Sequence, residues 1–412
     1  MTKYLLIICH IKKGVLNMKK IILSIISIFI IITILVVDNS KVINKEDNNK
    51  IKVNNNLLSM MLETKAGSGK YEMTTSSSWP TDGYVFNSEL SKCENGSTLS
   101  WDDANKQVVF NGNITDKCYV FFDKVFTLTS FVISQYTGTQ GENNIYHHDS
   151  NLTNGAGDNS YRYSSKSAKN YVCFGTDDTT CPKDNLYRII GLFGGNIKLV
   201  KNDYAGSDLI GTNGNYSGKA TTEEEVGYMG SKNPLEKYSF GSNNTWSSSK
   251  LNTINLNTNF INNIGNKWSN MIISAVWKVG GNTSTNILNN SVRTVFTNEI
   301  NNPVNNTYTA KIGLMYVSDF GYASVASRWT TMMEESSSGH ANIDNYLFLR
   351  FNDWTITPNS GNSDNVYATE SEGIVTTVSV NKAYGIRPAF YLKDSVMYVS
   401  GTGTILDPIR VN

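Results

Sequence analysis

Histidine is scarce in this chain of 412 residues, which contains only four. His147 and His148 are adjacent in a polar segment, so we expect them to lie exposed in a loop. Neighbouring side chains of an extended backbone point apart, so the two are not expected to act together. His340 is also expected in a loop. No two histidines have the i, i+4 spacing of a helical zinc site. The sequence therefore predicts neither a histidine-assisted catalytic set nor a metal site.

Charged residues are also few, at 17% of the chain, and nearly balanced, with 36 Lys and Arg against 35 Asp and Glu. A net charge of +1 leaves no basic surplus to neutralise phosphates, so nucleic acid is not expected as a partner. The glycine-rich stretch GTNGNYSGK lacks the spacing of a phosphate-binding loop. We expect no cofactor and no catalytic residues.

A single long apolar run, Ile21–Val37, follows two lysines and ends at Asp38. Its 17 residues are at the short end of a bilayer span, for which ~20 is typical. The lysines place that end in the cytoplasm. Residues 18–38 are therefore predicted to be a signal-anchor, with a cleaved signal peptide as the alternative. The remainder is expected outside the cell, secreted if the segment is cleaved, and residues 1–17 are interpreted as upstream sequence.

Cysteine is rare, and four of the five cysteines follow the apolar run. An even number outside the cell is typical of disulfides. Three pairings are possible, and proximity in sequence favours Cys93–Cys118 and Cys173–Cys181. No CxxC motif or histidine at ligand spacing accompanies them, which argues against a zinc site.

Changes in composition divide the rest of the chain into four parts. Residues 39–80 are polar and turn-rich and are interpreted as a spacer. Residues 81–123 contain short aromatic and β-branched runs separated by Asn, Gly and Asp, which predicts a small disulfide-linked all-β module. Residues 124–169 are expected to be a linker or loop. Residues 170–412 contain a hairpin around Gly194-Gly195, a short helical section and later strands, which predicts an α+β domain.

An ordered series of short motifs runs through residues 170–412. It resembles a bacterial extracytoplasmic family described only as a domain of unknown function. The series comprises the hairpin YRIIGLFGGNIKLVK, the residues Trp246, Ser249, Leu251, Leu256, Asn257 and Phe260, the strand GLMYVSD, and the end pattern of Trp354, Ile356, Pro358, Ala368, Gly373, Gly385, Arg387, Pro388 and Ala389.

That family is similar to the sulfatase-modifying-factor and C-type-lectin-like fold class, so the resemblance implies a C-type-lectin-like main domain. It does not by itself transfer a function. Formylglycine-generating enzymes of this class need a late cysteine pair, and no cysteine follows Cys181 here. The calcium motif of sugar-binding lectins is matched only by Asn352-Asp353-Trp354, with its letters in another order. Residues 58–123 resemble a small module of surface proteins from low-GC bacteria.

Asp319 and Trp329 are the two candidate ligand-binding residues. Trp246 and Trp354 are expected in the core, because they lie in apolar patterns. The sequence YGIRPAFYL contains Gly385, Arg387 and Pro388, for which a structural role is favoured. A buried arginine must be paired, so we expect either a carboxylate or several carbonyl groups to face Arg387. Because Pro388 cannot donate to a sheet ladder, we also expect an edge or an irregularity there.

The lack of a catalytic set, together with the resemblance, implies a bacterial cell-surface protein that is a non-enzymatic binding or interaction module for a glycan or protein. One alternative is an extracellular enzyme acting on glycans or cell wall, with an acid such as Asp319. The other is a structural or pilus-like surface component.

Overall fold

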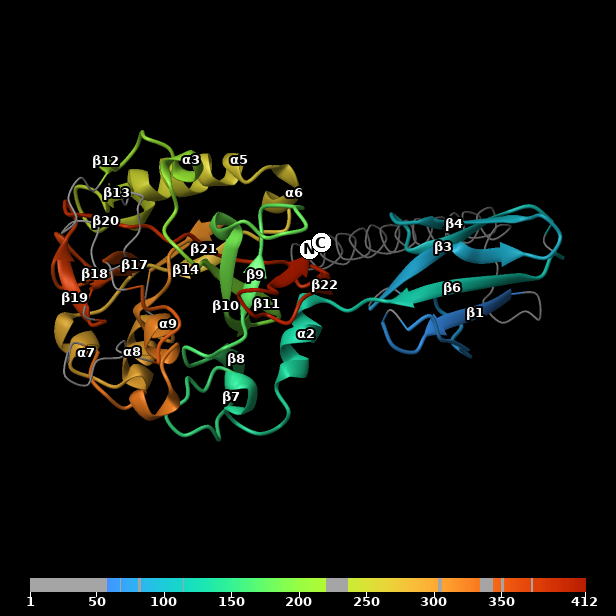
Figure 1. Cartoon of the computed structure of the whole chain (residues 1–412), viewed down its shortest axis with the longest axis horizontal. Coiled ribbons are helices and arrows are strands. Elements are labelled where there is room, and N and C mark those ends of the chain that lie inside the picture. The colour runs from blue at the N-terminus through green and yellow to red at the C-terminus, as the bar shows by residue number, and fades with distance from the viewer. Residues whose placement is uncertain are drawn as a thin grey trace, which may run out of the picture. The chain divides into compact units, whose positions relative to one another are not determined.

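The computed structural model describes residues 58–66, 68–80, 83–113, 115–219, 236–302, 306–333, 344–349, 352–371 and 373–412. The chain forms two compact units, Met1–Val125 and Phe126–Asn412. Both are drawn in Figure 1, and together they make a mixed α+β protein with many strands and short helices. Among the residues described, no helix has the length and apolar character needed to cross a membrane. The predicted segment 18–38 lies outside the described residues.

The first unit is built from β-strands, as predicted for residues 81–123. One sheet has the order β2-β1-β6-β3, in which β1 and β6 are parallel, and β4 and β5 form a separate hairpin. The strands are β1 (Leu58–Glu63), β2 (Tyr71–Met73), β3 (Tyr84–Cys93), β4 (Thr98–Asp102), β5 (Gln107–Asn111) and β6 (Cys118–Lys124).

Strands β1 and β2 lie in the segment that the sequence analysis interpreted as a spacer. Leu58 and Met60 alternate inward from β1 and pack with Val120 and Phe122 of β6 in the small core of this unit. In the sequence, this alternation of apolar residues is short, and the Asn, Ser and Gly residues around it are typical of a turn-rich segment. The module therefore begins at β1 rather than at residue 81.

The disulfide Cys93–Cys118 is confirmed. The two cysteines are directly paired residues of β3 and β6, with Cα atoms 4.0 Å apart. The bond therefore closes one end of this strand pair, in a unit whose apolar core is small.

The second unit is organised around a sheet of nine strands within the described residues. The main path runs β16 (Ile312–Gly313), β21 (Ala389–Tyr391), β11 (Asn196–Lys201), β10 (Leu186–Phe193), β9 (Tyr171–Cys173), β23 (Ile409–Val411) and β22 (Tyr398–Ser400). The predicted hairpin is confirmed as β10 and β11, which are antiparallel. Its turn uses Gly194 and Gly195 with φ of 55° and 91°, a left-handed backbone that glycine adopts without strain.

The expected linker at 124–169 is instead part of this unit. It contains α2 (Leu128–Gln135), β7 (Ile145–His148) and β8 (Ser160–Tyr163), and β8 pairs with both β7 and β10. Leu128 and Ile145 are buried in the main core. These elements are short and separated by Gly- and Asn-rich turns, so their composition is typical of a loop.

Helices and smaller sheets surround the main sheet (Figure 1). The helical section predicted near residues 245–264 is confirmed, and it includes a π-helix. The helical segments are η2 (Glu142–Asn144), η3 (Lys183–Asn185), α3 (Ser207–Ile210), η5 (Trp246–Ser248), the π-helix η6 (Leu251–Phe260), α5 (Ile261–Asn263), α6 (Asn266–Ser269), α7 (Ser284–Leu288), α8 (Val292–Glu299), α9 (Val317–Tyr322) and η7 (Ala326–Arg328).

The remaining strands form three small antiparallel sheets, β12-β13-β20, β14-β15 and β17-β18-β19. Their bounds are β12 (Tyr216–Lys219), β13 (Glu236–Ser239), β14 (Ala275–Lys278), β15 (Thr307–Ala310), β17 (Asp353–Pro358), β18 (Asn365–Thr369), β19 (Val375–Ser379) and β20 (Ala383–Tyr384).

Candidate functional site

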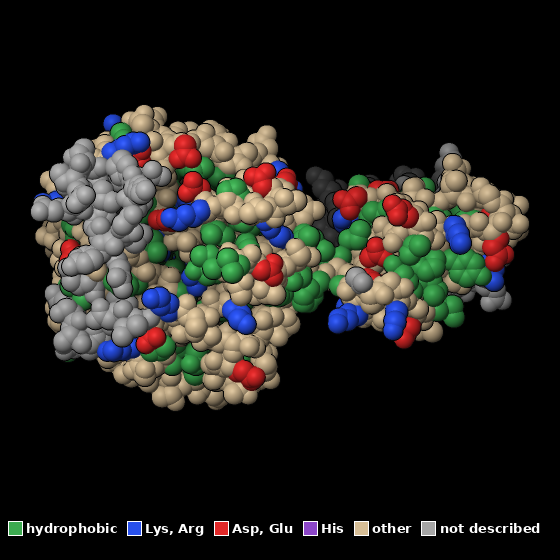
Figure 2. Space-filling model, viewed as in Figure 1, with side chains coloured by type: hydrophobic (Ala, Val, Ile, Leu, Met, Phe, Trp, Pro, Cys, Tyr) green, Lys and Arg blue, Asp and Glu red, His purple; other side chains and the backbone are tan. Residues whose placement is uncertain are grey.

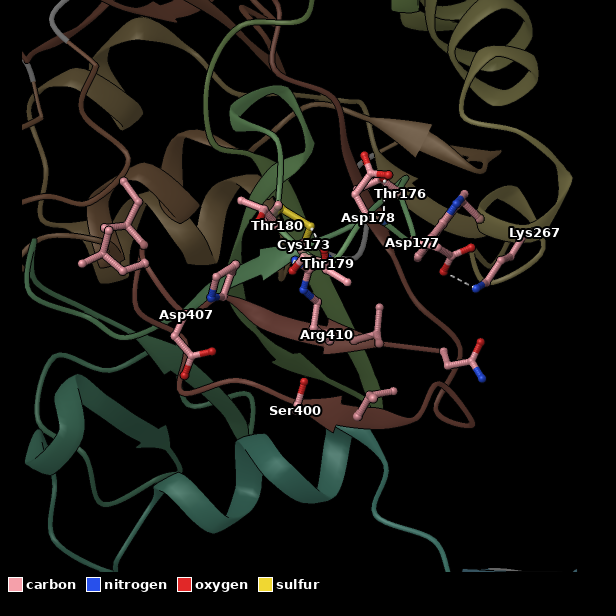
Figure 3. Close-up of a pocket in the computed structure, with 18 residues that line it drawn as sticks. Cys173, Thr176, Asp177, Asp178, Thr179, Thr180, Lys267, Ser400, Asp407 and Arg410 are labelled. Atoms are coloured by element: carbon pink, nitrogen blue, oxygen red, sulfur yellow. Dashed lines mark hydrogen bonds and ion pairs between the residues drawn. A yellow bond between two sulfur atoms is a disulfide. The ribbon is translucent and has the colours of Figure 1, made fainter.

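A surface groove of about 820 Å³ lies beside the last strands of the second unit. We call it the C-terminal groove. Its walls are the disulfide loop at residues 173–181, helix α6, and the β22–β23 hairpin with its connecting turn. Figure 3 shows Arg410 between the disulfide loop and Ser400, with Asp407 at one end and the Lys267–Asp177 pair at the other.

The disulfide loop is fixed to the β-sheet by Arg410. One guanidinium nitrogen of Arg410 lies 3.1 Å from Cys173 Sγ, and the other donates to the Thr179 carbonyl over 2.7 Å. The predicted disulfide Cys173–Cys181 is confirmed, with Cα atoms 5.8 Å apart. Because β23 also pairs in parallel with β9, the walls of the groove are held from two sides.

Three aliphatic side chains line the groove and are exposed to solvent. Val399 is 58% exposed, Ile405 54% and Leu406 94%. Isolated exposed apolar residues are ordinary, but a cluster around one concavity is typical of a surface that binds something. Ile405 and Leu406 lie in the polar turn sequence GTGTILDP, where no core position requires them.

The charged residues of the groove include carboxylates that remain at the surface. Asp177 is paired with Lys267 at 2.5 Å, and Lys267 also lies 4.9 Å from the ring centre of Trp268. Asp407 accepts from the backbone N–H of Thr402 at 2.9 Å. Asp178 is exposed, so the groove offers a carboxylate beside its aliphatic residues. On the face of the molecule that Figure 2 shows, acidic and basic side chains are interspersed.

Asp319, a predicted ligand candidate, lies inside the unit rather than at its surface. Its side chain is 3% exposed, and Oδ2 lies 2.5 Å from Lys198 Nζ on β11. The same oxygen accepts from the backbone N–H of Tyr316 at 2.8 Å, which caps α9. Arg162 Nη1 lies 3.9 Å from Oδ1. Asp319 is therefore the centre of a buried ionic cluster with Lys198 and Arg162.

Arg162 is held in this ionic cluster by groups near its own strand, β8. Its Nη2 lies 2.5 Å from Asp158 Oδ2, and Nε donates to Ser160 Oγ at 2.8 Å. The guanidinium also lies 4.6 Å from the ring centre of Phe193. A buried arginine with two polar partners and a ring face is well compensated for its loss of water.

Glu299, at the end of α8, lies beside the same helix start. Its two carboxylate oxygens accept from the N–H groups of Val317 at 3.0 Å and Ser318 at 2.9 Å, and the Thr357 hydroxyl also donates to it. The side chain is 1% exposed. Burial raises the pKa of the Glu299 carboxyl to about 7 despite these donors.

Trp329, the other predicted ligand candidate, is 1% exposed, and its Nε1 donates to the Ser324 carbonyl at 3.1 Å. Its ring packs against Tyr146 and His148. Trp329 is thus a core residue in this structure and presents no face to a surface ligand.

His148 was expected in an exposed loop, and that expectation is wrong. It is 0% exposed on β7, and its Nδ1 accepts from the Ala156 N–H at 3.0 Å. Burial lowers the pKa of His148 well below its usual value. His147 lies on the same strand, with its ring stacked on Tyr161 at 4.3 Å. The glycine- and asparagine-rich segment that follows masked the strand. His340 lies outside the described residues.

Arg387 is buried and faces a carboxylate, one of the two kinds of partner expected for it. Its Nε lies 2.6 Å from Asp353 Oδ2. The strand is irregular at Pro388, since β20 ends at Tyr384 and β21 begins at Ala389. A Cβ at Gly385 would lie 2.3 Å from the ring of Tyr204, so only glycine fits there. Trp246 and Trp354 are each 1% exposed in the core.

Asp319 and the Cys173–Cys181 disulfide are indicated by the sequence, but the other residues of the groove and of the ionic cluster are not. Leu406 could have been recognised from the sequence, because Ile405 and Leu406 form an apolar pair within a turn-rich segment. No sequence pattern identifies Lys198, because a single lysine in an apolar strand has many explanations. Within the described residues, no cluster of His, Cys, Asp and Glu is arranged to hold a metal ion.

Comparison of the chain with protein-family models, with curated proteins and with solved structures found no significant match.

Proposed function

We propose that the second unit is an extracytoplasmic binding module with a C-type-lectin-like domain, and that it takes a peptide segment of another protein in the C-terminal groove. The segment carries an aliphatic side chain next to a lysine or arginine. The observation that carries this proposal is the cluster of Val399, Ile405 and Leu406, exposed around one concavity of about 820 Å³.

The chemistry of the groove favours a peptide over a glycan. Sugars bind to exposed aromatic faces, but the described aromatic residue that lines the groove, Trp268, is 6% exposed. Aliphatic side chains suit an apolar peptide residue, whose burial contributes about 1.5–3 kcal/mol. The exposed carboxylate of Asp178 complements a basic residue next to it.

The enzymatic alternative gains no support from Asp319. A general acid or nucleophile must reach its substrate, and Asp319 is 3% exposed and paired with Lys198. The sequence-based expectation of an extracytoplasmic location is supported by the two disulfides, which persist in oxidising compartments.

A peptide array tests the proposal. The purified full chain is incubated with arrayed peptides that vary the apolar and basic positions, and bound peptides are then measured in solution. We expect enrichment of peptides with an aliphatic residue beside Lys or Arg. Leu406→Asp should abolish this binding without changing the melting temperature.

Val276→Asp is the matched control, because Val276 is 63% exposed on β14 and does not line the groove. It should bind like the wild type. An array without enrichment, or a Leu406→Asp variant that binds normally, would contradict the proposal. Binding that is instead selective for glycans would favour the other ligand class.

A further inference from the structure

We propose that Lys198 and Asp319 become joined by an amide bond between Lys198 Nζ and Asp319 Cγ, formed by the folded protein itself with loss of one water molecule. This inference is independent of the C-terminal groove. It starts from the 2.5 Å separation of Nζ and Oδ2 between side chains that are 1% and 3% exposed. The reacting atoms are therefore held together and away from solvent.

The surroundings of Lys198 favour condensation over hydrolysis. Four aromatic rings enclose Nζ, with ring centres at 4.3 to 5.9 Å, and they come from separate parts of the fold: Tyr316, Trp277, Tyr391 and Phe193. An enclosure of this kind excludes the bulk water that would reverse the reaction. It also makes the separated charges costly, whereas the amide product is neutral. Two reactants held in contact gain the rate advantage of an intramolecular reaction.

Glu299 is placed to carry protons for this reaction. Asp319 accepts from the N–H of Tyr316, and Glu299 accepts from the next two N–H groups along the chain, those of Val317 and Ser318. The two carboxyl groups therefore lie side by side at the start of α9. Burial raises the pKa of Glu299 to about 7, so this group exchanges a proton readily near neutral pH.

Arg162 supplies positive charge at the carboxyl group that reacts. Its Nη1 lies 3.9 Å from Asp319 Oδ1, and Asp158 and Ser160 hold the guanidinium in place. Negative charge develops on this oxygen when Nζ attacks Cγ. A fixed cation in a dry site stabilises that charge without needing to reorganise.

The atoms and electrons of the reaction balance without a co-reactant. The Lys198 ammonium first passes a proton to the Asp319 carboxylate, which leaves an amine and a carboxylic acid. The Nζ lone pair then forms the bond to Cγ, and the C=O π pair moves to oxygen. Glu299 takes a second proton from Nζ and delivers it to the departing hydroxyl, the C–O bond breaks, and water leaves. Nothing is oxidised or reduced.

Peptide mapping of the full chain by mass spectrometry decides the question. After incubation at neutral pH, reduction and tryptic digestion, we expect one branched species that contains the peptides around Lys198 and Asp319, lighter than their sum by one water. Trypsin should not cleave after Lys198. Recovery of both linear peptides with normal cleavage after Lys198 would overturn the proposal, and that measurement needs no variant.

Two variants test the assigned roles. Lys198→Arg keeps a cation but lacks the amine, so it should yield only linear peptides. Glu299→Gln keeps the shape and an acceptor oxygen but cannot carry the proton, so cross-linking should fall at least tenfold while circular dichroism remains native. A branched species in Lys198→Arg would contradict the assignment of Nζ, and full cross-linking in Glu299→Gln would contradict the role of Glu299.

Discussion

Arg387 and Asp353 form an ion pair in the interior of the second unit, with Nε 2.6 Å from Oδ2 and both side chains 2% exposed. Burial raises the pKa of the Asp353 carboxyl, and the charge of Arg387 opposes that rise. The pair joins the beginning of β17 to the irregular segment between β20 and β21. Loss of this ion pair should therefore weaken the contact between these two parts of the chain.

Replacement of Arg387 should destabilise the second unit. Arg387→Met leaves a buried charge without its partner and should cost about 3–5 kcal/mol in the free energy of unfolding. Arg387→Lys keeps the charge but loses the geometry of the guanidinium, and should cost about 2 kcal/mol. Denaturant titration followed by tryptophan fluorescence measures both. Arg293→Lys, at an exposed position, is the control and should unfold like the wild type.

The stability of the second unit should decrease as the pH rises from about 4.5 to about 7, because of Glu299. Its pKa is raised from 4.5 to about 7 in the folded protein, so the folded state binds more protons than the unfolded state across this window. The loss amounts to about 3 kcal/mol, at about 1.4 kcal/mol for each pKa unit.

Unfolding free energies across this pH range should show that slope in the wild type and not in Glu299→Gln. Comparing slopes rather than absolute values keeps the test separate from any cross-link, because a cross-link shifts the whole curve. His148 contributes with the opposite sign, since its lowered pKa costs stability below pH 6.5 in both proteins. Parallel slopes would show that Glu299 does not titrate in this window.

Loss of each disulfide should affect a different unit. Replacing Cys93 and Cys118 with serine should lower the stability of the first unit by about 3 kcal/mol, because the closed loop spans 25 residues. Replacing Cys173 and Cys181 should leave that unit unchanged and weaken binding in the groove. Calorimetry, together with the peptide-binding assay, separates the two effects. A first unit that melts normally without Cys93–Cys118 would contradict this.

Asp178→Asn should reduce the affinity for a basic peptide by a factor of about 1.4–5, as expected for an exposed ion pair worth about 0.2–1 kcal/mol. Raising the salt concentration to about 0.5 M should bring the wild type to the level of the variant, because the pair is then screened. Asp394→Asn, which is exposed and outside the groove, is the matched control. Equal salt dependence in wild type and Asp178→Asn would remove Asp178 from the binding site.

Trp329 should matter for folding rather than for binding. Trp329→Ala should cost about 3–5 kcal/mol, because it empties a packed position in the core. The milder Trp329→Phe should lower the melting temperature and leave peptide affinity unchanged. If Trp329→Phe instead melts like the wild type and loses the ligand, the sequence-based candidate was the better interpretation.

Local features of the fold could be predicted from the sequence. The hairpin at Gly194-Gly195 follows from two apolar runs around a turn, and the disulfides pair cysteines that are near each other in the chain. The strands of residues 81–123 follow from short aromatic and β-branched runs separated by Asn, Gly and Asp. In each case the residues that specify the feature lie within one or two elements.

The features that sequence reasoning missed depend on residues that are far apart. Lys198 and Asp319 are separated by 121 positions, so no local pattern indicates that they meet. The groove combines the loop at 173–181, helix α6 and the segment after residue 398. Strands β7 and β8 are short and surrounded by turn residues, and they form because β10 offers β8 a pairing edge. Composition alone favours a loop at such positions.

The first and last segments of the second unit are joined by backbone hydrogen bonds. Leu128 donates to the Val396 carbonyl at 2.8 Å, and Tyr398 donates to the Phe126 carbonyl at 2.9 Å. Because these two stretches are already neighbours, a short glycine-serine connection from Asn412 to Phe126 would allow circular permutation, with new ends opened at the Gly194-Gly195 turn. Such a rearranged chain should keep the ionic cluster and the groove intact, although its residues would be made in a different order.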